Sequence, residues 1–468
     1  MTLGAALLAF VLVHQAASSG PIAMLALAAP AAVALFVLWP RQLLVGIFVL
    51  VVLLEGSDPL FPQLAEPLYA SILKGLTIVD MLILLLLAGT GLDAYRNRRR
   101  LVGAGPLSWP LVLLAAATLA GAATGHARGA STKALFEPVI TLSHLGLLTI
   151  VVVNLARGRD VVRRGIALIA ILAAAKSVLG LLIVFSGRQQ AIRGAAVSYL
   201  EPTANWLVLL FLLGVLCCAL QRVRLPPWAW GATPLALADF VLSYRRSFWI
   251  AAVVGIAVVV LLGSGRRGRR VVIPSVAVLA VAASIFLSHL GSGEVTSSPV
   301  LKRVVSLNPS SLTANAEDRY RIDERRNVLA DLRAQPITGL GIAIPWTASS
   351  SLSLEHQGGR EYVHFAALWY WMKLGLLGLL AYAALALATL WSAVYVWRRH
   401  AVALVRAGAL ALLGAVLGLL LAEVTASFTG VDYRFSIVYP VILGLLAIAA
   451  VDVRQARERA STVAHGGL

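Results

Sequence analysis

Arginines and one histidine stand where apolar stretches of the chain begin. Arg245 and Arg246 lie in a very short turn between two apolar runs, and His364 directly precedes another. Guanidinium groups bind phosphate through two parallel hydrogen bonds, and an imidazole can accept the proton of an attacking hydroxyl. These residues could hold a phosphorylated substrate at a membrane surface and activate a nucleophile there. Headgroup contacts for the arginines and interfacial packing for the histidine are the alternatives, and position alone does not decide.

A longer polar segment, 291–366, adds further arginines. Within it, Asp318–Arg333 has the spacing of an amphipathic helix, ended by Pro336 and Gly339. Its apolar positions are Tyr320, Ile322, Val328, Leu329 and Leu332. Its arginines are Arg319, Arg321, Arg325, Arg326 and Arg333, and Arg360 follows. The pattern predicts an ordered lid with an interfacial helix, whose arginines either face headgroups and solvent or bind a substrate.

The composition places most of the chain in lipid. Of its 468 residues, 60% are hydrophobic and 13% are charged. The net charge of +18 does not indicate nucleic-acid binding, because most Lys and Arg stand in short loops between apolar runs. The only cysteines, Cys217 and Cys218, are adjacent in one apolar run, which excludes a disulfide framework and a zinc site. We predict an all-α polytopic membrane protein with about 12–14 transmembrane helices and one large extracytoplasmic loop.

Hydropathy marks about fourteen candidate spans, since a bilayer requires roughly 20 apolar residues per helix. They are 3–18, 21–39, 42–55, 75–93, 107–125, 135–155, 165–186, 203–221, 226–243, 248–264, 271–290, 367–396, 402–425 and 434–452. The first two are short and form either a helical hairpin or one broken element. The N-terminus lacks the basic segment and cleavage site of a signal peptide, so we expect the first run to be retained.

The connectors alternate between strongly basic and less basic. The basic ones are the arginine clusters at 96–100, 157–164, 222–224, 266–270, 398–399 and 454–459. By the positive-inside rule these face the cytoplasm, and both termini lie there too. The loops predicted to face outward are 56–74, 126–134, 187–202, 244–246, 291–366 and 426–433. The predicted units are a transmembrane bundle (1–290), the outward loop (291–366), C-terminal transmembrane helices (367–453) and a cytoplasmic tail (454–468).

Several charged residues fall inside predicted spans or next to them. Those inside are Asp80, Lys176, Asp239, Arg406 and Glu423. Such residues are costly in lipid, so they either form buried pairs or mark a substrate or proton route. The outward carboxylates Glu55 and Asp58 are candidates for a different chemistry, that of a glycosyltransferase using a polyprenyl-phosphate sugar.

Over roughly residues 200 to 395 the chain resembles the O-antigen ligase and polysaccharide polymerase family. Three landmarks carry the resemblance, in the order and on the side that this family shows. They are Arg246 in Tyr244–Arg245–Arg246–Ser247–Phe248–Trp249, Arg321 upstream of Gln335–Pro336–Ile337–Thr338–Gly339–Leu340–Gly341, and His364 before Lys373–Leu374–Gly375–Leu376–Leu377–Gly378. Asn205 resembles the family's helix-opening asparagine, although helix capping explains it equally well. Two positions differ, because Phe365 replaces a frequent asparagine and Arg325 replaces an aromatic residue.

The resemblance implies a glycosyltransferase of the bacterial cytoplasmic (inner) membrane. Its donor would be a glycan linked to undecaprenyl pyrophosphate, its acceptor the hydroxyl of a glycan or lipid-linked molecule, and its surroundings membrane lipid. The expected catalytic residues are His364, Arg246 and Arg321, and the expected substrate-binding residues are Arg245, Arg319, Arg325 and Asn205. Since arginines can neutralise the pyrophosphate, no metal and no cofactor is expected. Polymerase and ligase both fit, and inversion of the anomeric centre is implied by the family.

A non-enzymatic transporter, such as a flippase of lipid-linked oligosaccharides, is the alternative from another functional class. Transporters commonly show internal repeats and helices broken at the membrane midplane. The sequence has no convincing repeat and instead places arginines and a histidine in one large outward loop. This loop favours an enzyme.

Overall fold

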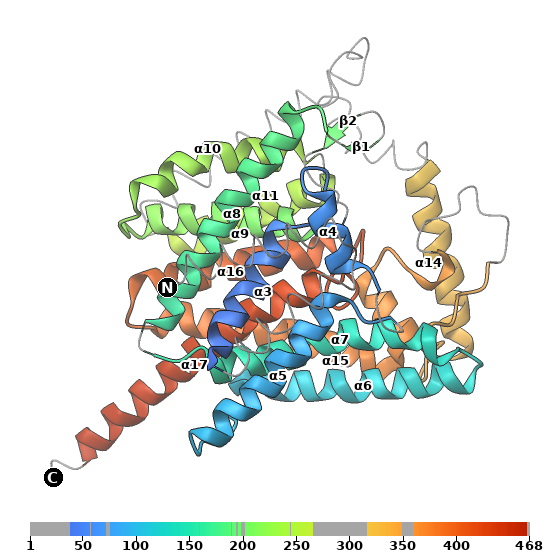
Figure 1. Cartoon of the computed structure of the whole chain (residues 1–468), viewed down its shortest axis with the longest axis horizontal. Helices are drawn as coiled ribbons and strands as arrows, with labels where there is room; N and C mark the ends of the chain where they lie inside the picture. The colour runs from blue at the N-terminus through green and yellow to red at the C-terminus, as the bar shows by residue number, and fades with distance from the viewer. Residues whose placement is uncertain are drawn as a thin grey trace.

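The computed structural model describes residues 38–264, 316–348 and 359–465, apart from 57, 72–74, 159, 189, 193–194, 198–201 and 244. This part of the chain is an all-α polytopic membrane protein, whose only other regular structure is a short hairpin of β1 (Gln190–Ile192) and β2 (Ala195–Val197). In Figure 1 the helices form one bundle, with α14 beside one end and the C-terminal part of α17 projecting from another side. The predicted fold class is confirmed.

Nine helices of the described part have the length and composition to cross a membrane. They are α5 (Ile78–Arg96), η1 with α6 (Gly105–Leu107 and Ser108–Ala127), α7 (Thr132–Leu155), α8 (Val161–Phe185), α9 (Pro202–Leu220), α11 (Arg246–Gly263), α15 (Ala366–Arg399), α16 (Ala403–Ala422) and α17 (Phe435–His465). The other elements are α3 (Pro40–Leu53), α4 (Pro62–Tyr69), α10 (Pro227–Leu242), the polar helix α14 (Ala316–Ala334) and η3 (Gly359–Glu361). Predicted spans 3–18 and 271–290, and nearly all of 21–39, lie outside the described residues.

Local signals in the sequence set several helix starts. Thr77 and Asp80 form a reciprocal capping box at the start of α5, and Ser131 caps α7 by accepting the N–H of Ala134 at 3.2 Å. Proline opens α3 and α10, where its missing N–H costs no helical hydrogen bond. The apolar runs therefore become helices at boundaries close to those that hydropathy predicts.

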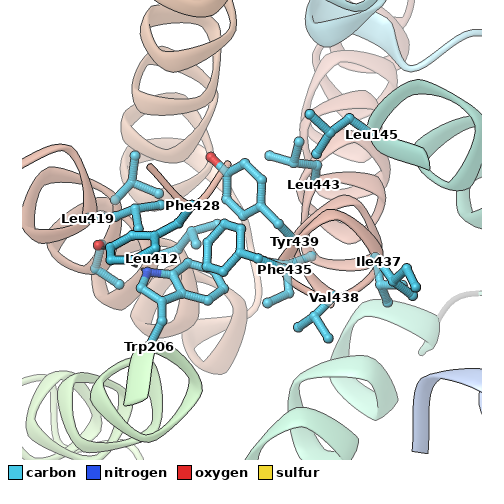
Figure 2. Close-up of a cluster of buried hydrophobic side chains, with 14 of the residues drawn as sticks. Leu145, Trp206, Leu412, Leu419, Phe428, Phe435, Ile437, Val438, Tyr439 and Leu443 are labelled. Atoms are coloured by element: carbon cyan, nitrogen blue, oxygen red, sulfur yellow. Dashed lines mark hydrogen bonds between the residues drawn. The ribbon is translucent and has the colours of Figure 1, made fainter. Parts of the chain in front are cut away.

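Aromatic packing joins three of these helices deep in the bundle (Figure 2). Trp206 of α9 is fully buried and donates from Nε1 to the carbonyl of Ala415 in α16 at 3.2 Å. Its ring meets Phe435 and Tyr439 of α17 edge-on, with centroid separations of 5.2 and 5.5 Å. This core holds the start of α9 against α16 and α17, the two helices that the 423–434 loop connects.

The loops that the charge pattern places on one side do lie together. Arg128, after α6, donates to the carbonyls of Gly339 and Leu340 at 2.7 and 2.8 Å. Thr203 donates to Asp432 at 3.2 Å, although more than 200 residues separate them. At the basic end, the charges of Arg99, Asp93 and Arg41 all act on Arg157. The alternation of connectors therefore corresponds to two opposite ends of the bundle.

Which end faces the cytoplasm stays a prediction, and cysteine labelling tests it. The native Cys217 and Cys218 are buried in α9, so they give little background. In spheroplasts, a membrane-impermeant maleimide should label Arg333→Cys, whereas Arg99→Cys should react only after permeabilisation; both parent side chains are exposed. Equal labelling of the two variants in intact spheroplasts would overturn the outward assignment of the long loop.

Helix α15 is broken at Gly375, and the segment 337–341 docks into the break. Gly375 adopts φ 71° and ψ −169°, a backbone conformation that residues other than glycine rarely adopt. The N–H of Leu340 donates to the carbonyl of Met372 at 2.6 Å, and the N–H of Leu376 donates to that of Ile337 at 2.9 Å. The loop thus supplies backbone hydrogen bonds that the interrupted helix cannot make itself.

Close backbone contact explains the glycines in both motifs. A Cβ on Gly339 would collide with the carbonyl oxygens of Trp371 and Met372, and one on Gly375 would collide with the carbonyl oxygen of Ile337. Gly341 packs in the same way against the backbone of Gly125 in α6. Two sequence landmarks that lie more than 30 residues apart are therefore the two halves of one joint.

Charged residues inside the bundle have partners. Lys176 and Arg434 each lie 3.5 Å from the carboxylate of Glu55. Asp80 lies 3.1 Å from Nε2 of His144. Glu423 accepts the hydroxyl of Tyr382 at 2.6 Å, Arg406 donates to the carbonyl of His400 at 3.0 Å, and Asp239 is buried in α10. Pairing, one of the two interpretations offered by the sequence, is confirmed for Asp80 and Lys176.

Candidate active site

His364 and Glu324 form a buried pair at the junction of the long loop and α15. Nδ1 of His364 lies 3.1 Å from both carboxylate oxygens of Glu324, and the backbone N–H of His364 donates to Oε2 at 2.8 Å. The exposed fractions are 6% for His364 and 0% for Glu324. A carboxylate at Nδ1 favours the tautomer with its proton there, which leaves the lone pair on Nε2. The pair therefore has the arrangement of a general base held by an orienting acid.

Two tyrosines enclose this imidazole. The rings of Tyr362 and Tyr320 meet it edge-on, with centroid separations of 4.9 and 6.2 Å. Burial raises the pKa of Tyr362 to about 12, so its hydroxyl stays protonated at neutral pH. That hydroxyl donates to the carbonyl of Ser427 at 3.3 Å and accepts the Ser427 N–H at 2.9 Å. The segment that carries His364, between η3 and α15, is thereby fixed to the 423–434 loop.

The same loop brings the arginine turn of α11 to this end of the bundle. Phe428 stacks on Phe248, with ring centroids 5.6 Å apart. Phe248 is the third residue of α11, which begins at Arg246, and Arg245 is its N-cap. Both arginines are half-buried. The N-terminus of α11 adds the positive end of a helix dipole, so this end of the helix favours an anion.

The arginines of α14 differ in their surroundings. Arg321 and Arg325 are half-buried, and the charge of Arg321 acts on Tyr362 and on Arg325. Arg319, Arg326 and Arg333 are exposed. Of the arginines on this helix, Arg321 and Arg325 therefore flank the histidine pair.

Arg325 and Phe365, the two positions that differ from the family pattern, contact each other. The guanidinium of Arg325 lies over the ring of Phe365 at 5.1 Å from its centroid and also donates to the carbonyl of Val424. A cation over an aromatic face is a favourable pair, worth about 0.5–2 kcal/mol. The two departures thus compensate each other and tie α14 to the start of α15.

Asn205 lies near the same end but does not cap a helix. It is 3% exposed and stands in the first turn of α9, three residues after the helix begins at Pro202. Thr203 in the same turn donates to Asp432, whose charge acts on Tyr362. The capping interpretation is wrong, and a role for Asn205 toward a substrate stays a prediction.

Glu55 and Asp58, the carboxylates of the alternative glycosyltransferase chemistry, are buried and held by contacts within the protein. Glu55 is 2% exposed and pairs with Lys176 and Arg434. Asp58 is 3% exposed and accepts the N–H groups of Leu60 and Phe61 at 2.9 and 3.0 Å, next to the start of α4. These contacts give both residues a role in holding the loop between α3 and α4. Across the described residues, no group of three or more His, Cys, Asp or Glu is arranged to hold a metal ion.

Sequence reasoning missed Glu324, although a signal for it exists. Glu324 falls one helical turn after Tyr320 and one turn before Val328, so it occupies the stripe of α14 that becomes buried. Ile322 and Leu329, which were counted with the apolar positions, lie on the more exposed face, at 38% and 37% exposed. A lone carboxylate on an otherwise apolar stripe requires a buried partner, and His364 is that partner.

The fold and this site define a multi-pass membrane protein with a basic, histidine-bearing site at one end of its bundle. Residues 231–383 match the model of the family described as O-antigen ligase, so this part of the chain is similar to that family and supports a family assignment. The match includes Arg245, Arg246, Arg321, Glu324 and His364, together with the joint at Gly375. No curated protein matches the chain.

Proposed function

We propose that the protein transfers a glycan from an undecaprenyl-pyrophosphate-linked donor to an acceptor hydroxyl at the outer face of the bacterial cytoplasmic membrane. The family match supports a membrane glycosyltransferase of the O-antigen ligase or polymerase type. The observation that carries the proposal furthest is the buried Glu324–His364 pair beside Arg321.

In the proposed reaction, the acceptor oxygen attacks the anomeric carbon while the bond from that carbon to the phosphate oxygen breaks. The acceptor proton passes to Nε2 of His364, and Glu324 stabilises the imidazolium that forms. The leaving pyrophosphate gains negative charge, which Arg246 and Arg321 would stabilise. A single displacement of this kind inverts the anomeric centre. Arg245, Arg325 and Asn205 would contribute to binding around this centre, and Arg319 would lie at its edge.

The lipid-linked glycans of a deletion strain test this proposal and separate its two versions. Loss of a polymerase should leave single repeat units attached to the final acceptor. Loss of a ligase should leave long chains on the carrier lipid. Mass analysis of the carrier-linked and acceptor-linked pools distinguishes the two results. Unchanged pools in the deletion strain would exclude both versions.

We also expect glycan transfer by the purified enzyme to continue in EDTA. The arginines supply the charge neutralisation that a divalent ion supplies in other pyrophosphate chemistry. The measurement is the transfer rate with and without chelator, with added magnesium or manganese as the control. Loss of transfer in EDTA and its rescue by either metal would contradict the arginine-based mechanism.

A further inference from the structure

The end of the bundle opposite the candidate active site holds an apolar cavity. Its volume is about 200 Å³. It lies among the basic-end halves of α8, α9, α16 and α17 and the start of α10, and it includes Val162 at the start of α8 and Leu404 at the start of α16. An engineered apolar cavity of about 150 Å³ stays dry and binds benzene. This cavity is therefore large enough for a segment of hydrocarbon, and its lining is almost wholly apolar.

Among the described residues that line this cavity, Arg224 alone is charged. It is exposed and stands in the connector between α9 and α10, beside Pro226 and Trp228, which is 42% exposed. Tryptophan and arginine are the residues that membrane proteins place at the level of lipid headgroups. The lining thus combines an apolar interior with one phosphate-binding group at the membrane surface.

We propose that this cavity binds an acyl chain of an anionic glycerophospholipid whose phosphate contacts Arg224. A carrier isoprenoid fits less well, since the proposed function places its pyrophosphate at the opposite end, by Arg246 and Arg321. The inference goes beyond glycan transfer, because it assigns a lipid site at the other membrane face. Filling the space between α8, α9 and α16 with hydrocarbon would restore the dispersion contacts that an empty cavity lacks.

The glycines of the lining provide a specific test. Gly214 of α9 lines the cavity, and a Cβ built on it meets no atom within 4 Å. Gly214→Phe places a large apolar side chain at this lining position and should occupy the cavity. Gly231 of α10 also has open space at its Cβ but does not line the cavity, so Gly231→Phe is the matched control.

The experiment measures lipid binding to the delipidated full-length protein in detergent, by native mass spectrometry and by thermal unfolding. Phosphatidylglycerol should bind and raise the Tm of the parent protein. Its affinity should fall about tenfold or more in Arg224→Gln, in line with the loss of a charged hydrogen bond, and similarly in Gly214→Phe. Gly231→Phe should bind like the parent. Arg224→Gln changes an exposed connector residue, so it keeps the test valid if Gly214→Phe does not fold.

Three results would overturn the proposal. The first is equal binding of phosphatidylglycerol to the parent, Gly214→Phe and Arg224→Gln. The second is equal binding of phosphatidylcholine and phosphatidylglycerol to the parent, which would remove the role of charge. The third is displacement of phosphatidylglycerol by undecaprenyl phosphate at equal concentration. None of these results would affect glycan transfer at the opposite end, so failure here is distinct from failure of the proposed function.

Discussion

Replacing His364 with alanine is expected to lower the rate of glycan transfer by about a hundredfold or more, in line with the loss of a positioned general base. Donor binding should persist, since the proposed donor contacts come from arginines. The measurement is single-turnover transfer by the purified enzyme beside an independent determination of donor affinity. A variant that transfers glycan at the parent rate, while it folds and inserts normally, would exclude His364 as the base.

The Glu324–His364 pair allows a sharper test of the same step. Glu324→Gln retains the shape of the side chain but removes the charge that stabilises an imidazolium. We expect a smaller loss of rate than in His364→Ala and a shift of the acidic limb of the pH–rate profile to lower pH. Asp323 is a matched control, because it is the adjacent carboxylate, is partly exposed and faces Arg326 at 3.8 Å. Asp323→Asn should leave the profile unchanged, and equal profiles for both variants would reduce Glu324 to a structural role.

The helices could be predicted from the sequence because their signal is local. Apolar runs of sufficient length must hydrogen-bond their own backbone in lipid, so span and helix coincide from α3 to α11 and again from α15 to α17. The helix predicted over Asp318–Arg333 is also confirmed, as α14. Its buried face was harder to predict, because that face depends on what α14 packs against and carries Glu324.

The arrangement of the site could not be predicted residue by residue, since it depends on contacts between distant segments. The contact between Gly339 and Gly375 forms only when the segment 337–341 enters the break in α15. Neither motif alone indicates that it packs against the other. The hydrogen bonds between Ser427 and Tyr362, which are 65 residues apart in the sequence, likewise depend on the tertiary fold. In the sequence, Arg325 and Phe365 are two unrelated departures from the family pattern. Only their contact in the structure shows that they compensate each other. Residue types indicated the chemistry, and tertiary packing decided which arginines stand beside the histidine.

The arginines proposed to stabilise the leaving pyrophosphate are expected to be intolerant even of lysine. Arg246→Lys and Arg321→Lys should each lower transfer about a hundredfold, close to the effect of alanine, because an ammonium group cannot reproduce the planar two-point contact with phosphate.

Arg326→Lys and Arg333→Lys are the matched controls, since both parent side chains are exposed on α14, and they should retain near-parent rates. Arg325 is unsuitable as a control, because its guanidinium is held by Phe365 and Val424. If all four lysine variants lose activity alike, or all four retain it, the arginines of this end act through general charge at a headgroup surface. Arg246 and Arg321 would then have no specific contact with the pyrophosphate.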